Sequence, residues 1–274
     1  MPSRRPRHDR LDRLLTARGL APTRARAQAL VLAGRVHSGG MRLDKPGMQV
    51  AVEAPLEVLP GPAYVGRGGH KLAWALRASG LVVAGRRALD VGASTGGFTQ
   101  ALLEAGAGRV IALDVGRGQL DWGLRSDPRV VPLEGVNARY LVPGQLPFAP
   151  HLAVMDVSFI SALQVLPAVM GCLPDDGEVL CLVKPQFEVG RGKVGRGGIV
   201  RDAALHRSVL VGVAESVRRS GWCLLDVLRC PTRGAEGNVE FFVHLARRGS
   251  GLDPAATSMR IAEAVQPPGQ DGAE

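Results

Sequence analysis

The stretch LDVGASTGGFTQALL, residues 89–103, joins a short apolar run to a glycine-rich turn and then to the start of a helix. In parallel α/β sheets such a turn leads from a strand into a helix, and ligands bind beyond the carboxyl ends of the strands. The chain after residue 65 keeps alternating between strand and helix patterns. The sequence therefore predicts an α/β fold, in which helices cover both faces of a mostly parallel sheet.

The alternation sets boundaries for the expected elements. Strands are predicted at Arg87–Val91, Arg109–Asp114, Val130–Leu133, Leu152–Asp156, Glu178–Lys184, Asp226–Arg229 and Val239–Leu245. Helices are predicted at His70–Ser79, Phe98–Glu104, Gln119–Ser126, Ser161–Met170 and Arg201–Arg219. The Gly/Pro/Ala-rich end, residues 249–274, is predicted to be a mobile tail that holds one helix near Pro254–Val265.

The glycine-rich turn limits the kind of cofactor. Gly92 and Gly97 match the outer glycines of GxGxxG, but Ser94 stands where the middle glycine lets the backbone approach a pyrophosphate. This favours a cofactor without phosphates, such as S-adenosylmethionine. Asp90 is placed to hold its ammonium group through a water or the backbone, and Asp114, at the tip of the next strand, to accept both ribose hydroxyls. A structural turn with a capping aspartate is the alternative.

Charged residues also interrupt the ends of apolar strand patterns. Asp156 follows LAVM, Lys184 follows VLCLV, and Glu240 precedes FFVHL. If the last strand runs antiparallel to its neighbours, these three side chains meet at one edge of the sheet, and Lys71 can join them from the preceding helix. Two lysines held by two carboxylates could align a ribose 2′-hydroxyl with a methyl donor and help to remove its proton. Lys184 is the hypothetical base, and no metal is required. Taken singly, each residue could also be a solvated charge.

The first 60 residues form a separate, basic region. They carry eleven of the chain's lysines and arginines against five acids, which is +6 of the formal net charge of +9. Residues 1–9 are expected to be a loose arm. Two short helices follow, one with Leu11, Leu14 and Leu15 on its apolar face and one capped by Thr23, and then small strands. Pro60-Gly61-Pro62 is the expected linker. A basic region next to a larger domain suggests a polyanion, most often nucleic acid, although a solvated basic surface is equally compatible.

The remaining composition limits where the chain works. Its four cysteines form no CxxC pair and are expected to be reduced thiols of a cytoplasmic protein. The N-terminus lacks the apolar core of a secretory signal, and no apolar run approaches the length that spans a bilayer. A membrane role would have to be peripheral.

These stretches together carry a resemblance to a known family. Residues 65–244 resemble RNA 2′-O-ribose methyltransferases with an FtsJ-like Rossmann domain, and the whole chain resembles the TlyA (haemolysin A-like) family of ribosomal RNA cytidine-2′-O-methyltransferases. The matching stretches are GRGGHKL, LDVGASTGGFT, DVGRGQL, NAR, DVSFIS, LVKPQFEVGRGKVGRGGIV and GNVEFF. The stretch RLDRLLTARGLAPTRARAQALVLAGRVHSGG resembles the RNA-binding domain named after ribosomal small-subunit protein four.

The resemblance implies a Rossmann-like, seven-stranded methyltransferase that depends on S-adenosylmethionine, behind a small α+β RNA-binding domain. The implied domains are residues 1–60, a linker at 61–65, the methyltransferase at 66–248 and the tail. The implied catalytic residues are Lys71, Asp156, Lys184 and Glu240. The implied cofactor contacts are Gly92, Ser94, Gly96, Asp114, Asn137, Asp156 and Phe159, although Phe159 could equally be a core aromatic.

The expected partner is ribosomal RNA within ribosomal subunits, small and large, bound by a monomer. Arg24 and Arg26, in the first turn of the second short helix, are expected to bind a phosphate together with free backbone N–H groups. The other predicted RNA contacts are Arg4, Arg5, Arg7, Lys45, Arg67 and Lys193, the last in a loop at 190–198 that could close on RNA. The alternatives are a nicotinamide oxidoreductase, a membrane-active haemolysin-like protein, and an RNA-binding module with an inactive enzyme domain.

Overall fold

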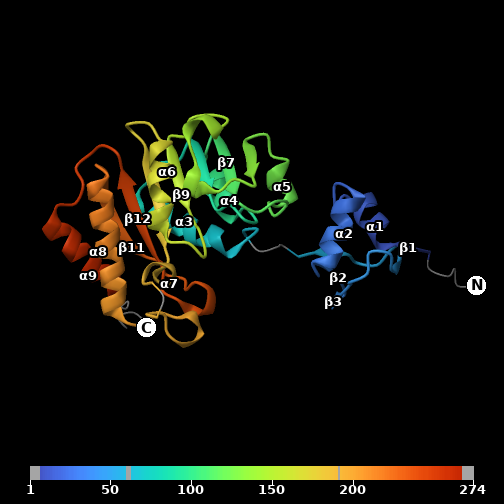
Figure 1. The fold of residues 1–274 in the computed structure, drawn as a ribbon. Coiled ribbons are helices and arrows are strands. Elements are labelled where there is room, and N and C mark those ends of the chain that lie inside the picture. The colour runs from blue at the N-terminus through green and yellow to red at the C-terminus, as the bar shows by residue number, and fades with distance from the viewer. Residues whose placement is uncertain (1–6, 60–62, 191, 267–274) are drawn as a thin grey trace, which may run out of the picture. The chain divides into compact units, whose positions relative to one another are not determined.

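The computed structural model describes residues 7–59, 63–190 and 192–266. The chain divides into two compact units, Met1–Ala63 and Tyr64–Glu274 (Figure 1). The linker expected at Pro60-Gly61-Pro62 lies outside the described residues. The division falls close to the boundary that the sequence predicts.

The N-terminal unit packs two helices against short strands. The helices are α1 (Leu11–Ala17) and α2 (Arg24–Leu32), and the strands are β1 (His8–Arg10), β2 (Val36–Ser38), β3 (Met41–Arg42), β4 (Gln49–Ala51) and β5 (Glu57–Val58). β1 pairs with β4, and β2 lies between β3 and β5. The predicted apolar faces of both helices are confirmed, because Leu11, Leu15, Ala27 and Val31 are fully buried together.

One expectation for this unit is wrong. The basic arm predicted at residues 1–9 is not loose throughout, since His8 begins β1 and pairs with Ala51, and Arg10 pairs with Gln49. These pairs satisfy backbone groups that a free arm would leave to water. Of the arm, residues 1–6 lie outside the described part of the chain.

The larger unit is built on a seven-stranded sheet. Its strands are β6 (Arg87–Val91), β7 (Arg109–Asp114), β8 (Val130–Glu134), β9 (Leu152–Met155), β10 (Glu178–Val183), β11 (Cys223–Arg229) and β12 (Phe241–Ala246). The spatial order is β11-β12-β10-β9-β6-β7-β8. The strands from β6 to β10 are parallel, whereas β12 runs antiparallel to both β10 and β11. The predicted α/β class and the antiparallel last strand are confirmed.

Helices cover both faces of this sheet (Figure 1). They are α3 (Arg67–Ser79), α4 (Gly97–Glu104), α5 (Trp122–Arg125), α6 (Leu166–Gly171), α7 (Pro185–Glu188), α8 (Ala203–Arg219) and α9 (Pro254–Val265). Alternate residues of a strand face opposite cores, as β6 shows: Leu89 packs in the core that includes α6, α8 and α9, and Ala88 in the core that includes α3 and α4. The sheet is therefore buried on both sides, as its apolar strands require.

Two helix predictions are too long. The helix expected at Gln119–Ser126 is confined to α5, whose first turn is capped by Asp121 through the N–H of Gly123. The helix expected at Ser161–Met170 divides into a 3₁₀ turn at Ala162–Gln164 and α6. Pro167 explains this break, because proline fits the first turn of a helix but not its interior.

The predicted mobile tail is the larger error. The helix predicted at Pro254–Val265 is present as α9, but it packs on α8 and β11, and Ile261 is fully buried in the main core. Arg229 of β11 donates from Nη1 to the carbonyls of Ala264 and Val265 at the end of this helix. Residues up to Gln266 thus belong to the larger unit, and 267–274 lie outside the described residues.

Candidate active site

The glycine-rich turn after β6 packs directly on the end of β9. Gly92 has a φ of +86°, and a Cβ at this position would lie 2.4 Å from the carbonyl oxygen of Asp156. On the other side, a Cβ at Gly97 would lie 2.9 Å from the backbone nitrogen of Gly69 in α3. Only glycine allows these approaches. The turn thereby brings the ends of two strands and the start of α3 together at one edge of the sheet.

Two adjoining cavities open at this edge. One, of about 420 Å³, is lined by Gly92, Ser94, Asp114, Asn137 and Phe159, among others. The second, of about 550 Å³, shares Gly92, Ser94, Asp156, Ser158 and Phe159 with the first and extends to the predicted catalytic residues. Volumes of this size suit small-molecule ligands.

The structure brings the four predicted catalytic residues into the larger cavity. Lys71, Asp156, Lys184 and Glu240 all line it. They form two ion pairs: Lys71 Nζ lies 2.5 Å from Glu240 Oε2, and Lys184 Nζ lies 2.6 Å from Asp156 Oδ1. The four come from α3, the end of β9, the end of β10 and the start of β12, so the antiparallel direction of β12 is what places Glu240 beside the others.

The pairs differ in how deeply their carboxylates are buried. The side chain of Glu240 is 2% exposed and that of Asp156 is 21% exposed, whereas both lysine side chains are 11% exposed. A carboxylate that is buried in its charged form needs a close cation, and Lys71 supplies it for Glu240. Lys184 also donates a 2.7 Å hydrogen bond to Ser158 Oγ, so two groups beyond the end of β9 fix its ammonium.

Asp114 holds the edge of the smaller cavity. Its Oδ2 accepts the backbone N–H of Ser94 at 2.8 Å, and its Oδ1 accepts that of Gly116 at 2.7 Å. The carboxylate is therefore oriented by backbone groups on both sides of the turn, with lone pairs left for further donors. Asn137 lines the same cavity and uses its Oδ1 to accept the N–H of Arg139.

Phe159 is not a core aromatic. Its side chain is 93% exposed, its φ is +64°, and it lines both cavities beside Phe187, with ring centroids 5.4 Å apart. A bulky residue in the left-handed region is strained, and such strain concentrates at functional sites. Sequence reasoning missed Ser158, Gln186 and Phe187 as lining residues; their signal is that they lie within three positions of Asp156 or Lys184.

Two predicted cofactor contacts lie elsewhere. Asp90 is fully buried and lines neither cavity; its Oδ2 accepts a 2.6 Å hydrogen bond from Thr99, and burial raises its pKa to about 7. Asp90 is the fourth of the five residues of β6, and its side chain lies among the helices that cover the sheet, next to Thr99 of α4. Gly96 faces Leu124 and Leu120, where a Cβ would lie within 2.3 Å and 2.8 Å of their methyl carbons, and it too lines neither cavity.

The predicted RNA contacts belong to both units. Arg67 lines the larger cavity, and Lys193 is exposed in the loop whose residues Val194 and Gly198 line it. Arg7 and Lys45 are exposed in the N-terminal unit, and Arg4 and Arg5 lie outside the described residues.

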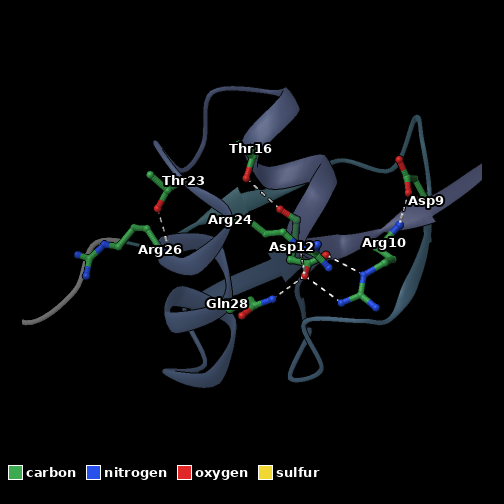
Figure 2. Close-up of polar contacts among 8 residues, drawn as sticks. All are labelled: Asp9, Arg10, Asp12, Thr16, Thr23, Arg24, Arg26 and Gln28. Atoms are coloured by element: carbon green, nitrogen blue, oxygen red, sulfur yellow. Dashed lines mark hydrogen bonds and ion pairs between the residues drawn. The ribbon is translucent and has the colours of Figure 1, made fainter.

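The side chains of Arg24 and Arg26 point in different directions (Figure 2). The N–H of Arg26 already donates to Thr23 Oγ1, and Arg24 Nε donates to Asp12. The N–H of Arg26 is therefore not free for a phosphate, and RNA binding by the two arginines stays a prediction.

Within the described ranges, no helix combines the length and apolarity needed to cross a membrane. The same ranges hold no cluster of three or more His, Cys, Asp or Glu side chains arranged to bind a metal ion.

A seven-stranded sheet with one antiparallel inner strand, and cavities beyond its first glycine-rich turn that contain two lysine–carboxylate pairs, defines a Rossmann-like methyltransferase. Comparison with known families agrees: residues 64–247 match the FtsJ-like methyltransferase, and residues 9–55 match the S4 domain. The chain belongs to the FtsJ-like methyltransferase family and, within it, to the TlyA group that carries an S4 domain.

Individual relatives cover nearly the whole chain. The 16S/23S rRNA (cytidine-2′-O)-methyltransferase TlyA of Mycobacterium tuberculosis is 46% identical over 94% of this chain and 96% of its own length. Hemolysin A of Brachyspira hyodysenteriae is 37% identical over 86% of this chain and 98% of its own. A solved structure described as "Putative hemolysin from Streptococcus thermophilus" is 40% identical, has a TM-score of 0.70, and covers 94% of this chain and 96% of that one.

Proposed function

We propose that this protein transfers a methyl group from S-adenosylmethionine to the ribose 2′-hydroxyl of cytidine in ribosomal RNA, in both the small and the large subunit. The observation that carries the proposal is the meeting of Lys71, Asp156, Lys184 and Glu240 in one cavity next to the glycine-rich turn. The relative of Mycobacterium tuberculosis, whose name states this activity on 16S and 23S rRNA, supports the substrate.

The smaller cavity fits S-adenosylmethionine. The Asp114 carboxylate, oriented by the N–H groups of Ser94 and Gly116, is suited to accept ribose hydroxyls, and Asn137 and Phe159 would contact the rest of the molecule. Ser94 in the turn leaves no cradle for a pyrophosphate, which disfavours a nicotinamide dinucleotide. When bound, this cofactor supplies an electrophilic methyl group carried on a sulfonium.

The protein's own side chains would handle the proton. A ribose hydroxyl is a weak nucleophile because it keeps its proton, so a base within hydrogen-bond reach accelerates attack. Lys184, fixed by Asp156 and Ser158, would receive the 2′-hydroxyl proton on its Nζ as a neutral amine. Lys71, held by Glu240, would contribute positive charge in the same cavity and stabilise the ribose oxygen as it loses its proton.

The N-terminal unit would hold the RNA. The S4 domain match and the +6 charge of residues 1–60 support this role. Arg67, which lines the larger cavity, and Lys193, which precedes the lining residue Val194, would contact the RNA near that cavity. The target nucleotide would have to leave its stack to reach the lysines. All four catalytic residues come from one chain, which supports action as a monomer, on ribosomal subunits in the cytoplasm.

Methylation of purified ribosomal subunits tests the proposal. The wild-type chain and Lys184→Ala are incubated with methyl-labelled S-adenosylmethionine and each subunit, and the labelled nucleotides are mapped. We expect label on cytidine 2′-oxygens with the wild type and none with Lys184→Ala. Label on a base nitrogen or carbon would overturn the ribose assignment, and affinity for NAD(H) without affinity for S-adenosylmethionine would overturn the cofactor.

A further inference from the structure

A buried carboxylate in the N-terminal unit is contacted by two arginines. Asp12, in the first turn of α1, is completely buried, and four donor atoms from three residues meet at it (Figure 2). Arg10 donates from Nε to Oδ1 at 3.1 Å and from Nη2 to Oδ2 at 2.9 Å. Arg24 Nε and Gln28 Nε2 both donate to Oδ2, at 2.9 Å and 2.8 Å.

The two arginines remain partly in solvent. The side chain of Arg10 is 37% exposed and that of Arg24 is 50% exposed. Arg10 uses two of its nitrogens on Asp12, and Arg24 uses only Nε, so Nη1 of Arg10 and both Nη groups of Arg24 make no further hydrogen bond with the residues that the structure describes. Two cations on one carboxylate leave the cluster with a net charge of +1.

The cluster also adjoins the turn that carries Lys45. The backbone N–H of Asp12 donates to the carbonyl of Pro46 at 3.0 Å, and a Cβ at Gly47 would lie 3.2 Å from Arg10 Nη1. Arg10 of β1 and Arg24 of α2 are therefore brought together by contacts with a single aspartate, next to the turn that contains Lys45.

We propose that Asp12 is a positioning residue, which fixes Arg10 and Arg24 as one fork for a single backbone phosphate of the RNA. This inference rests on the proposed function and extends it to a site and to two residues, Arg10 and Asp12, that the sequence did not mark. Free arginine side chains lose rotamer entropy when they bind a ligand. Arg10 and Arg24 would lose less, because Asp12 already restricts their rotamers in the free protein. The remaining Nη donors of a guanidinium match the oxygens of a phosphate.

A purely structural role is the main competing explanation, since Asp12 also ties α1 to β1 and α2. The two explanations differ in the sign of one measurement. Asp12→Asn makes the RNA-binding unit more positive by one charge, so simple electrostatics predicts tighter RNA binding. If Asp12 positions the arginines, the same substitution weakens binding although it adds positive charge.

Asp44→Asn provides the matched control. Asp44 is exposed in the same unit, next to Lys45, and its substitution changes the net charge by the same amount. The full-length protein is titrated with a fluorescent RNA hairpin, and the dissociation constant is measured at several salt concentrations. We expect Asp12→Asn to weaken binding about tenfold, the size of one lost charge-assisted contact, and Asp44→Asn to tighten it by up to about threefold. Tightening by Asp12→Asn would overturn the proposal.

Two further comparisons of variants keep the test decisive if Asp12→Asn fails to fold. Arg24→Lys keeps the charge but loses the planar guanidinium, and we expect nearly the loss of affinity caused by Arg24→Gln; wild-type affinity in Arg24→Lys would contradict the fork. Arg10→Gln combined with Arg24→Gln should weaken binding by clearly less than the product of the two single effects, because one phosphate is shared. A fully multiplicative effect would mean two independent sites.

Kinetics separate this inference from the proposed function. On ribosomal subunits, Asp12→Asn should raise KM and leave kcat within about twofold, because Asp12 lies in a different unit from the catalytic lysines. If the wild type methylates no ribose, the proposed function fails. If it does and Asp12→Asn keeps the wild-type KM, only the positioning role fails.

Discussion

Both units pair poorly exposed carboxylates with cations, but the larger unit uses lysine and the N-terminal unit uses arginine. In the larger unit, Glu240 is buried against Lys71 and Asp156 lies against Lys184. In the N-terminal unit, Asp12 is buried against Arg10 and Arg24. In both, carboxylates hold cations in fixed positions. The lysines line a cavity, whereas the arginines are 37% and 50% exposed at the surface.

The difference follows from the chemistry of the cations. A lysine amine can lose its proton when its surroundings favour the neutral form, so it can take part in proton transfer. A guanidinium stays charged at every accessible pH and offers donors in a fixed plane, which suits the binding of phosphate. The comparison therefore supports the proposed roles, proton transfer for the lysine cluster and phosphate binding for the arginine cluster. Exchanging lysine and arginine is the most direct test of these roles.

The largest effect is expected from Lys184→Arg. This variant keeps a cation beside Asp156 but cannot receive the hydroxyl proton, so we expect kcat to fall by about 10²- to 10⁴-fold, the usual contribution of a general base. Single-turnover methylation of ribosomal subunits measures it, and calorimetric binding of S-adenosylmethionine, expected to be unchanged, is the control. Activity within about tenfold of wild type would mean that Lys184 acts through charge alone.

Lys71→Met tests the ion pair between Lys71 and the buried carboxylate of Glu240. Removing the cation leaves a carboxylate that is 2% exposed without compensation, and we expect the larger unit to lose about 3 kcal/mol of unfolding free energy. Adding Glu240→Gln should restore most of the stability, because the amide is neutral, but not the activity. Urea unfolding followed by tryptophan fluorescence measures this unit alone, since Trp74, Trp122 and Trp222 all lie in it. If the double variant regains activity, the pair is structural only.

Most of the fold could be predicted from local patterns. The bounds of β6 and β7 are as expected, because apolar runs between glycines leave little choice of register. The tail could not be predicted, because Ile261 and Val265 of α9 show no more apolar character than a surface helix, and only their packing on α8 and β11 reveals that they are core residues. Short strands such as β1 likewise depend on a partner that is distant in sequence.

The candidate site could likewise be predicted only in part. Lys71, Asp156, Lys184 and Glu240 could be placed together because strand direction alone brings their positions to one edge of the sheet. Asp90 was misplaced although the bounds of β6 were predicted correctly, because the strand pattern does not show that its side chain faces the helix layer, where Thr99 of α4 donates to it. The role of Asp12 could not be predicted because two of its three partners, Arg24 and Gln28, are 12 and 16 residues away on another helix.

Asp90 gives the next test, as a buried carboxyl group that forms no ion pair with the residues that the structure describes. Burial raises its pKa to about 7, well above the value of an unfolded chain, about 4. Between these values the folded state holds a proton that the unfolded state releases, so stability should fall as pH rises through this window, by up to a few kcal/mol. Urea unfolding of wild type and Asp90→Asn at about pH 5 and pH 8 measures it. A wild-type stability that is as independent of pH as that of Asp90→Asn would contradict the prediction.

Asp12 should show the opposite and smaller pH dependence. The hydrogen bonds from Arg10, and then those from Gln28 and Arg24, hold the pKa of Asp12 well below its usual range. Its contribution to stability is therefore complete above the unfolded value, about pH 4, and is lost as pH falls toward the folded value. The effect is limited because the arginines are partly exposed, where solvent screens the attraction.

Fluorescence cannot detect this loss, since residues 1–60 contain no tryptophan or tyrosine, so hydrogen exchange of the buried α1 amides around Leu14 and Leu15 is the appropriate measurement. With exchange corrected for its intrinsic pH dependence, protection of α1 should fall between about pH 4 and pH 2.5 in the wild type and remain constant in Asp12→Asn. Falling pH would then loosen the N-terminal unit through Asp12, whereas rising pH, between about 4 and 7, would destabilise the larger unit through Asp90. Protection of α1 that is independent of pH in the wild type would mean that the partners of Asp12 leave its ionisation unchanged, and the positioning of Arg10 and Arg24 would lose its electrostatic basis.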